Sequence, residues 1–169
     1  KRMFDESEFL SDFGIRSLSK YHQKHPYKFA FEGGSMQVDY TPAESTGDMF
    51  GGNSNWRGPI WFPMNYLILD SLSKFSDYYG SDYEVEYPTN SGQMMNIKDA
   101  ASGVSKRLLA MFVPGKDGKI PMYGEYEKMQ SDQNFKDKYL FFEYFDLLTE
   151  PQLIDRHYQE NAPGRTESE

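Results

Sequence analysis

The most constraining feature of this 169-residue sequence is the segment at residues 51–66, which reads GGNSNWRGPIWFPMNY. It contains both tryptophans of the chain, Trp56 and Trp61, together with Arg57. Paired glycines at its start adopt positive φ without steric cost, and the asparagines that follow favour turns. Pro63 suits the first turn of a helix, where its missing N–H does no harm. The segment therefore predicts a loop that leads directly into a helix.

Aromatic rings and a guanidinium held in such a loop suggest a sugar-binding site. Flat rings cover the apolar C–H faces of a sugar, while planar donors bind its hydroxyl groups, and ligand pockets generally combine apolar walls with few polar groups. The competing interpretation is that each tryptophan is simply a core residue, which is the commoner fate of this residue type. Arg57 favours a binding site, because an arginine beside a tryptophan is seldom buried without a partner.

Composition narrows the classes of ligand and partner. The formal net charge is −8 and aromatic residues make up 17% of the chain, a balance that suits a neutral ligand such as carbohydrate. It argues against nucleic acid or an anionic membrane surface as a partner, since both attract clustered lysine and arginine. No stretch of 18 apolar residues predicts a membrane span, and the absence of cysteine favours, without proving, a cytoplasmic location.

No metal site is expected from the residues. The chain has no cysteine, and its three histidines, His22, His25 and His157, show no metal-ligand spacing with nearby acidic residues. The start at Lys1, without an initiator methionine, suggests an internal piece of a longer protein.

The spacing of apolar residues and the positions of capping and turn residues predict the secondary structure. A hairpin is expected at residues 27–40, and helices are expected at 63–79 and at 97–112, the second capped by Asn96. An aromatic run predicts a third helix over residues 132–148. We divide the chain into residues 1–150, a partial domain, and residues 151–169, a polar tail expected to be disordered beyond about residue 158.

The residues around the tryptophans resemble a known family. The Trp-Arg-Gly-Pro-Ile-Trp core at 56–61, with supporting matches at 8–19, 40–45 and 141–145, is similar to the C-terminal catalytic region of glycoside hydrolase family 63 and the related mannosylglycerate hydrolase-like glucosidases. The resemblance implies an all-α chain that forms the C-terminal part of an (α/α)6 toroid, with long active-site loops and a small β-hairpin. It also implies inverting hydrolysis of an α-glucoside or α-mannoside, such as mannosylglycerate, without a cofactor.

Inverting hydrolysis requires a general acid and a general base. The resemblance implies that the acid comes from an upstream half of the barrel, which would be this chain's partner, so the isolated chain would have little activity. Glu143 is the candidate base, because surrounding aromatic residues would raise its pKa, although it could equally lie on the solvated face of a helix. Glu44 is the second candidate carboxylate. The expected substrate-binding residues are Asn55, Trp56, Arg57, Trp61 and Arg16.

The chain departs from the family after residue 145. Where relatives continue into a glycine-rich loop and a Gly-Trp-Thr-Gly-like segment, residues 146–151 lead into the polar tail, which suggests a truncated or fragmentary domain. A non-catalytic carbohydrate-binding or structural helical module is therefore the alternative function.

Overall fold

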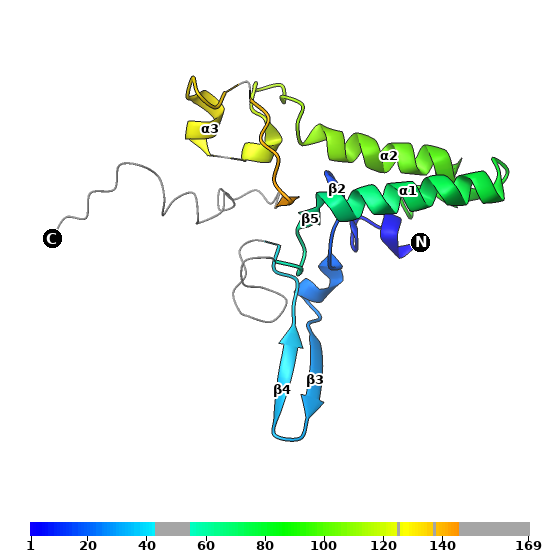
Figure 1. Ribbon diagram of the computed structural model, residues 1–169. Helices are drawn as coiled ribbons and strands as arrows, with labels where there is room; N and C mark the ends of the chain where they lie inside the picture. The colour runs from blue at the N-terminus through cyan, green and yellow to red at the C-terminus, as the bar shows by residue number, and fades with distance from the viewer. Residues whose placement is uncertain (43–54, 125, 137, 146–169) are drawn as a thin grey trace.

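The computed structural model describes residues 1–42, 55–124, 126–136 and 138–145. Within them, three α-helices alternate with short strands that form two-stranded antiparallel sheets (Figure 1). The helices are α1 (Phe62–Tyr79), α2 (Ile97–Ala110) and α3 (Glu127–Ser131), and short 3-10 helices lie at Arg2–Phe4, Lys20–Gln23 and Pro121–Tyr123. No described helix is both long and apolar enough to cross a membrane.

The strands pair as β1 (Leu10–Ser11) with β2 (Gly14–Ile15), β3 (Tyr27–Phe31) with β4 (Gly34–Val38), β5 (Ile60–Trp61) with β8 (Tyr144–Phe145), and β6 (Glu84–Glu86) with β7 (Met94–Asn96). The expectation of an all-α chain that forms part of an (α/α)6 toroid is therefore wrong, since the described residues have a mixed α/β architecture. The error arises because strands of two or three residues are too short to show a periodicity in the sequence.

The two long helices begin and end where local signals predict. Pro63 lies in the first turn of α1, and Gly80 ends the helix with a φ of 76°. The Asn96 side chain caps α2 by accepting a hydrogen bond from the backbone N–H of Asp99 at 2.8 Å. The helix ends at Ala110, two residues before the predicted end.

The predicted third helix is wrong over its described residues. The α3 helix ends at Ser131, just before the expected start, and the following aromatic residues form turns and then β8. Aromatic residues fit a pleated surface well, so tertiary pairing can override a weak helical pattern. Residues 146–169, including the predicted tail, lie outside the described part of the chain.

The core lies between α1, α2 and the chain segments that cross them. The two helices run side by side, and α2 buries Ile97, Ala100, Val104 and Leu108 along one face (Figure 1). By contrast, α1 buries Asn65 and Leu72 and leaves many large side chains exposed. The other buried apolar residues of this core are Phe4, Leu10, Ile15, Ile60, Tyr87, Met111, Ile120, Met122, Tyr123, Met129 and Phe145.

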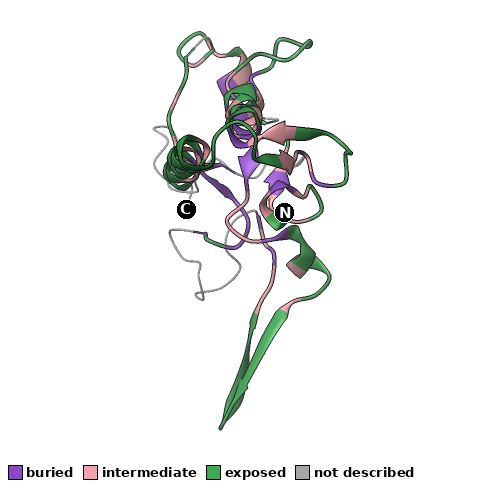
Figure 2. Cartoon of the chain, turned by 90° about the vertical axis from the view of Figure 1, so that its right-hand side faces the viewer, coloured by how far each residue is buried: buried purple, intermediate pink, exposed green. Residues whose placement is uncertain are grey.

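The predicted hairpin is confirmed as β3 and β4. The strands pair over five residues, from Tyr27 opposite Val38 to Phe31 opposite Gly34. The hairpin extends away from the two long helices (Figure 1), and its strands are exposed along almost their whole length (Figure 2).

Asn65 is the main polar link between α1 and the N-terminal strands. Its side chain is 1% exposed, and its Oδ1 accepts a hydrogen bond from the backbone N–H of Ile15 at 2.8 Å. Its Nδ2 donates to the carbonyls of Ile15 and Trp61, each at 2.9 Å. One amide group thus satisfies backbone groups of β2 and of the residue before α1, which positions the tryptophan segment on the core.

A close contact also positions α2. A Cβ at Gly103 would lie 2.4 Å from Cε1 of Tyr87, so only glycine lets the buried Tyr87 ring approach the helix. The guanidinium of Arg107 lies over the same ring, 5.9 Å from its centroid, and the Tyr87 hydroxyl has no hydrogen-bond partner among the described residues. Burial raises the pKa of this hydroxyl above its usual value, although Arg107 opposes the shift.

Replacing Asn65 with alanine is expected to destabilise the chain. The substitution leaves the N–H and carbonyl of Ile15 without their side-chain partner, and each buried unpaired group costs about 1–3 kcal/mol. We expect a loss of at least about 2 kcal/mol in the free energy of unfolding, measured in urea. Asn134→Ala, at an exposed position, is the matched control and should change stability by less than about 0.5 kcal/mol. Equal effects of the two substitutions would contradict the linking role of Asn65.

The raised pKa of Tyr87 predicts a pH dependence. A group whose folded-state pKa is raised contributes stability that is fully present below its unfolded pKa of about 10 and is lost as the pH rises through the folded value. Tyr87→Phe should therefore gain stability relative to the wild type between pH 9 and pH 11, as measured by urea midpoints. Tyr78→Phe is the control, because Tyr78 is 83% exposed, and it should show no such gain. A Tyr87→Phe difference that does not change with pH would refute this assignment.

Candidate functional site

The glycine of the Trp-Arg-Gly-Pro core has a steric role. Gly58 has a φ of 137°, and a Cβ at this position would lie 2.6 Å from Cε2 of Tyr40 and 3.1 Å from Cα of Pro42. A side chain here would both strain the backbone and collide with the 40–42 segment. The Ser17 hydroxyl accepts a hydrogen bond from the N–H of Gly58 at 3.0 Å, so the loop is held from two sides.

The two tryptophans stack on one another and extend towards a third ring. The centroids of Trp56 and Trp61 are 3.8 Å apart with an interplanar angle of 10°, and Trp61 also stacks on Tyr144 at 5.0 Å. Trp61 is only 4% exposed, whereas Trp56 is 41% exposed. The two tryptophans thus differ in exposure: Trp61 is buried and supports Trp56, whose indole is exposed to solvent.

Asn55 ties the loop together through its side chain and its carbonyl. The side chain is 1% exposed, with Oδ1 accepting from the N–H of Arg57 at 2.9 Å and Nδ2 donating to the carbonyl of Thr41 at 2.6 Å. The Asn55 carbonyl accepts a hydrogen bond from Nε1 of Trp61 at 2.8 Å. The sequence predicts a substrate-binding role for Asn55, and the described contacts are those of a residue that shapes the loop.

Arg57 is buried and forms an ion pair. Its side chain is 7% exposed and lies 3.3 Å from Oδ1 of Asp39, whose side chain is 38% exposed. The backbone carbonyl of Arg57 accepts a hydrogen bond from the N–H of Thr41 at 2.7 Å. This arrangement places a carboxylate that is still partly open to solvent beside the tryptophan loop, at the end of the hairpin.

Strand pairing brings Glu143 to the tryptophan segment. Ile60 lies opposite Phe145 and Trp61 opposite Tyr144, while the N–H of Phe62 donates to the carbonyl of Glu143 at 3.0 Å. The backbone of Glu143 therefore lies next to the segment that carries Trp61, although the two are distant in sequence. Its side chain is exposed and sits on a bend before β8, so the aromatic burial expected for a desolvated base is not found in the described structure.

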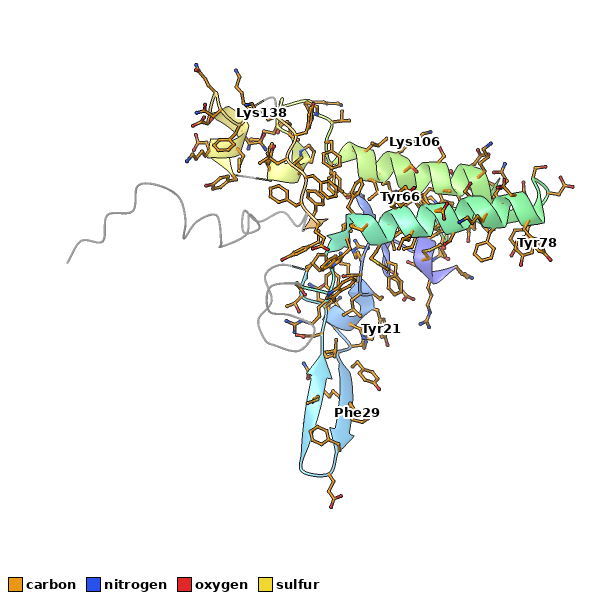
Figure 3. The ribbon with its side chains drawn as sticks, viewed as in Figure 1. Tyr21, Phe29, Tyr66, Tyr78, Lys106 and Lys138 are labelled. Atoms are coloured by element: carbon orange, nitrogen blue, oxygen red, sulfur yellow. The ribbon has the colours of Figure 1, made fainter. Side chains whose placement is uncertain are left out.

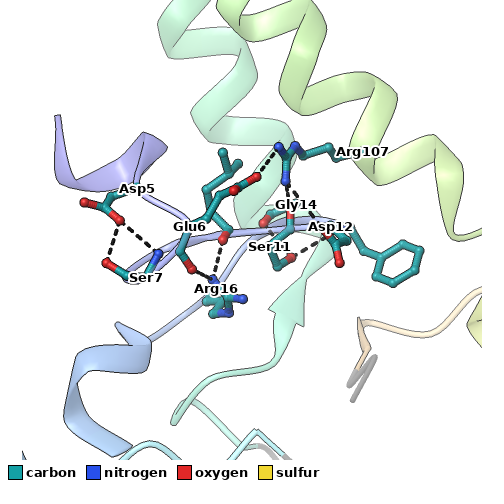
Figure 4. A network of polar contacts seen from close by, with 10 residues as sticks. Asp5, Glu6, Ser7, Ser11, Asp12, Gly14, Arg16 and Arg107 are labelled. Carbon is teal, nitrogen blue, oxygen red and sulfur yellow. Dashed lines mark hydrogen bonds and ion pairs between the residues drawn. The ribbon is translucent and has the colours of Figure 1, made fainter. Parts of the chain in front are cut away.

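Arg16 faces a different part of the molecule. Its guanidinium donates to the carbonyls of Glu6 at 3.3 Å, of Glu8 at 3.2 Å and of Leu10, which holds the N-terminal loop in place (Figure 4). Arg107 completes this network from α2 by binding the carbonyl of Ser11 and the carboxylate of Glu6 (Figure 4). The side chain of Arg16 is thus engaged by backbone carbonyls of the N-terminal segment.

Glu44 lies outside the described residues, as does His157. His22 and His25 lie near each other at the base of the hairpin, where both rings contact Tyr21. Across the described ranges, no group of three or more histidine or acidic side chains is placed to hold a metal ion.

Sequence reasoning missed three residues that shape this site: Asp39, Tyr144 and Asn65. Asn65 carried a usable signal, because a polar residue on the apolar side of a predicted helix requires a buried partner. Asp39 and Tyr144 carried none, since their partners Arg57 and Trp61 are distant in sequence and are reached only through the folded chain.

Comparison with known proteins points to one family. Residues 42–95 match the model of the Glycosyl hydrolase family 63 C-terminal domain, and this match includes the tryptophan segment. The uncharacterized protein YMR196W of Saccharomyces cerevisiae is 50% identical over 147 residues, which cover 86% of this chain and 14% of that protein. A probable mannosyl-oligosaccharide glucosidase of Schizosaccharomyces pombe is 41% identical over 73 residues, which cover 43% of this chain and 6% of that protein.

The chain thus spans only a small part of the curated relatives that it matches, 14% of one and 6% of the other. The matched family, the glucosidase relative and the tryptophan segment agree with one another and with the resemblance inferred from the sequence. This chain contains a glycosyl hydrolase family 63-like region.

Proposed function

We propose that this chain supplies the sugar-binding platform and the general base of an α-glycosidase that hydrolyses its substrate with inversion. The observation that carries the proposal is the β5–β8 pairing, which brings Glu143 beside the stack formed by Trp56, Trp61 and Tyr144. Glycosidases need such a combination, because an apolar platform orients the sugar while a carboxylate activates the attacking water.

Each residue has a distinct role in this proposal. Trp56 contacts the sugar, since its indole is exposed and its ring rests on the buried Trp61. Arg57 and Asn55 hold the loop in its conformation. Asp39, which pairs with Arg57, is exposed enough to accept hydrogen bonds from sugar hydroxyls. Arg16 acts indirectly, by holding the N-terminal loop against the strand that precedes Ser17.

The catalytic step requires a second carboxyl group. In inverting hydrolysis the base removes a proton from water while an acid protonates the leaving oxygen, with the two groups about 6.5–9.5 Å apart. In our proposal Glu143 acts as the base, with its exposed carboxylate accessible to water, and the acid comes from a separate part of a longer polypeptide. The substrate class is an α-glucoside or α-mannoside, in agreement with the name of the Schizosaccharomyces pombe relative, a probable glucosidase.

A non-catalytic carbohydrate-binding role is the second candidate. The exposure of the Glu143 side chain favours it, because the expected catalytic base is a carboxylate enclosed by aromatic residues. In that case Trp56 would still bind sugar, and substitution of Glu143 would leave sugar binding at the site unchanged.

Trp56→Ala should weaken sugar binding. Removing the indole deletes roughly 60 Å² of apolar contact, which costs about 1.5 kcal/mol and reduces affinity about tenfold. The measurement is calorimetry with methyl α-glucoside and methyl α-mannoside. Tyr78→Ala is the control, since it removes an exposed ring at the far end of α1 (Figure 3) and should have no effect. Unchanged affinity after Trp56→Ala would exclude this platform, and no heat with any sugar would exclude binding by the chain.

Glu143→Gln should strongly slow hydrolysis in a longer enzyme that carries this segment. Loss of a general base lowers kcat by about 10²–10⁴-fold, while the isosteric amide should leave substrate affinity nearly unchanged. Glu84→Gln, at an exposed position on β6, is the matched control and should retain full activity. If Glu143→Gln kept near wild-type kcat while Trp56→Ala still impaired binding, the site would be a binding platform and the base would lie elsewhere.

A further inference from the structure

The β3–β4 hairpin has two chemically different faces. Because side chains alternate along a strand, the register places Tyr27, Phe29 and Phe31 on the same side as Val38 and Met36. We call these five residues the hairpin face. The opposite side carries Lys28, Ala30, Ser35 and Gln37, which suit contact with water.

The hairpin face is open to solvent in the described structure. Tyr27, Phe29, Phe31 and Met36 are 57%, 54%, 45% and 48% exposed, and the rings of Phe29 and Phe31 stack on each other at 6.2 Å. Figure 3 shows Phe29 on the extended arm, away from the helices, and Figure 2 shows the arm exposed along almost its whole length.

The hairpin face needs a partner surface, because a hairpin with exposed apolar side chains is only marginally stable in water. A two-stranded hairpin is at best marginally stable in water, and it becomes stable when a further apolar layer covers it. Contiguous exposed apolar patches on proteins usually mark interfaces. The hairpin alternates regularly and places five apolar side chains on one face. This pattern indicates that another apolar surface packs against this face.

The relatives indicate what covers it. A match of 147 residues in a chain of 169 leaves 22 unmatched, so the match with the Saccharomyces cerevisiae relative extends across residues 27–38 wherever it begins. That relative is much longer, since the match covers 14% of it. The segment that matches the hairpin therefore belongs, in that relative, to a much longer polypeptide.

We propose that the hairpin face docks on an apolar, uncharged surface in another part of a longer glycosyl hydrolase family 63-like polypeptide. The surface would extend for about 17 Å, the length of a five-residue strand. A second copy of this chain fits less well, because each copy has a net charge of −8 and the hairpin face has no charged residue to offset that repulsion. This inference is independent of the proposed function, since it holds whether the site hydrolyses sugars or only binds them.

Hydrogen exchange of the amides of residues 27–38 tests the proposal. The chain is measured alone and as a chimera, in which it replaces the matched segment of the Saccharomyces cerevisiae relative. We expect exchange to be at least about 100-fold slower in the chimera, because docking suppresses opening of the hairpin. Phe29→Glu should abolish this slowing, while Ala30→Glu, which adds the same charge to the opposite face, should retain it.

Three outcomes would overturn the proposal. The first is equal exchange in the chain and the chimera, and the second is equal sensitivity to the two substitutions. The third is slow exchange that depends on the concentration of the isolated chain, which would identify a second copy as the occupant. If the chimera does not fold, capture of the relative lacking its matched segment by the immobilised chain gives the same comparison. There, Phe29→Glu should reduce capture at least tenfold, whereas no capture by the wild type would refute docking.

Discussion

The arrangement of this chain depends on the amide side chain of Asn65. It is buried in α1 and bonds both backbone polar groups of Ile15 and the carbonyl of Trp61. Burying an amide is favourable only when its hydrogen bonds are satisfied, and here the bonds it makes join three separate segments. The helix start, the β1–β2 turn and the tryptophan loop are therefore fixed together, so the position of Trp61 follows from the packing of α1.

The candidate site is a consequence of that placement. With Trp61 fixed, β5 can pair with β8, and the pairing stacks Tyr144 on Trp61 and brings Glu143 alongside. The exposed indole of Trp56 rests on Trp61, while the Arg57–Asp39 ion pair connects the loop to the base of the hairpin. A short sheet between distant segments thus brings the backbone of Glu143 to the segment that carries Trp61.

Apolar surface remains exposed on more than one element. Besides the hairpin, α1 leaves Leu67, Phe75 and Tyr78 exposed, and the helical spacing puts Leu67 and Tyr78 on a different side of the helix from Leu72. A surface helix normally keeps its apolar residues on one stripe that faces the core, so apolar residues on a second side are typical of a helix between two layers. Both features agree with a segment that spans a small fraction of its relatives' length.

Local signals in the sequence are enough to define several of the elements. Pro63 and Gly80 delimit α1, Asn96 caps α2, and the alternation around Gly33 and Gly34 specifies the hairpin, because caps, turns and periodicity act within a few residues. The motif at residues 56–61 likewise identified the family, because it consists of adjacent residues and requires no knowledge of how the chain folds.

Tertiary contacts, and not local signals, set the mixed α/β architecture, the extended form of residues 144–145 and the exposure of Glu143. They also set the different roles of the two tryptophans and the engagement of Arg16 by backbone carbonyls. These features depend on partners many residues away, such as Trp61 for Tyr144. A two-residue strand has no periodicity of its own, so its conformation is set by the strand it meets.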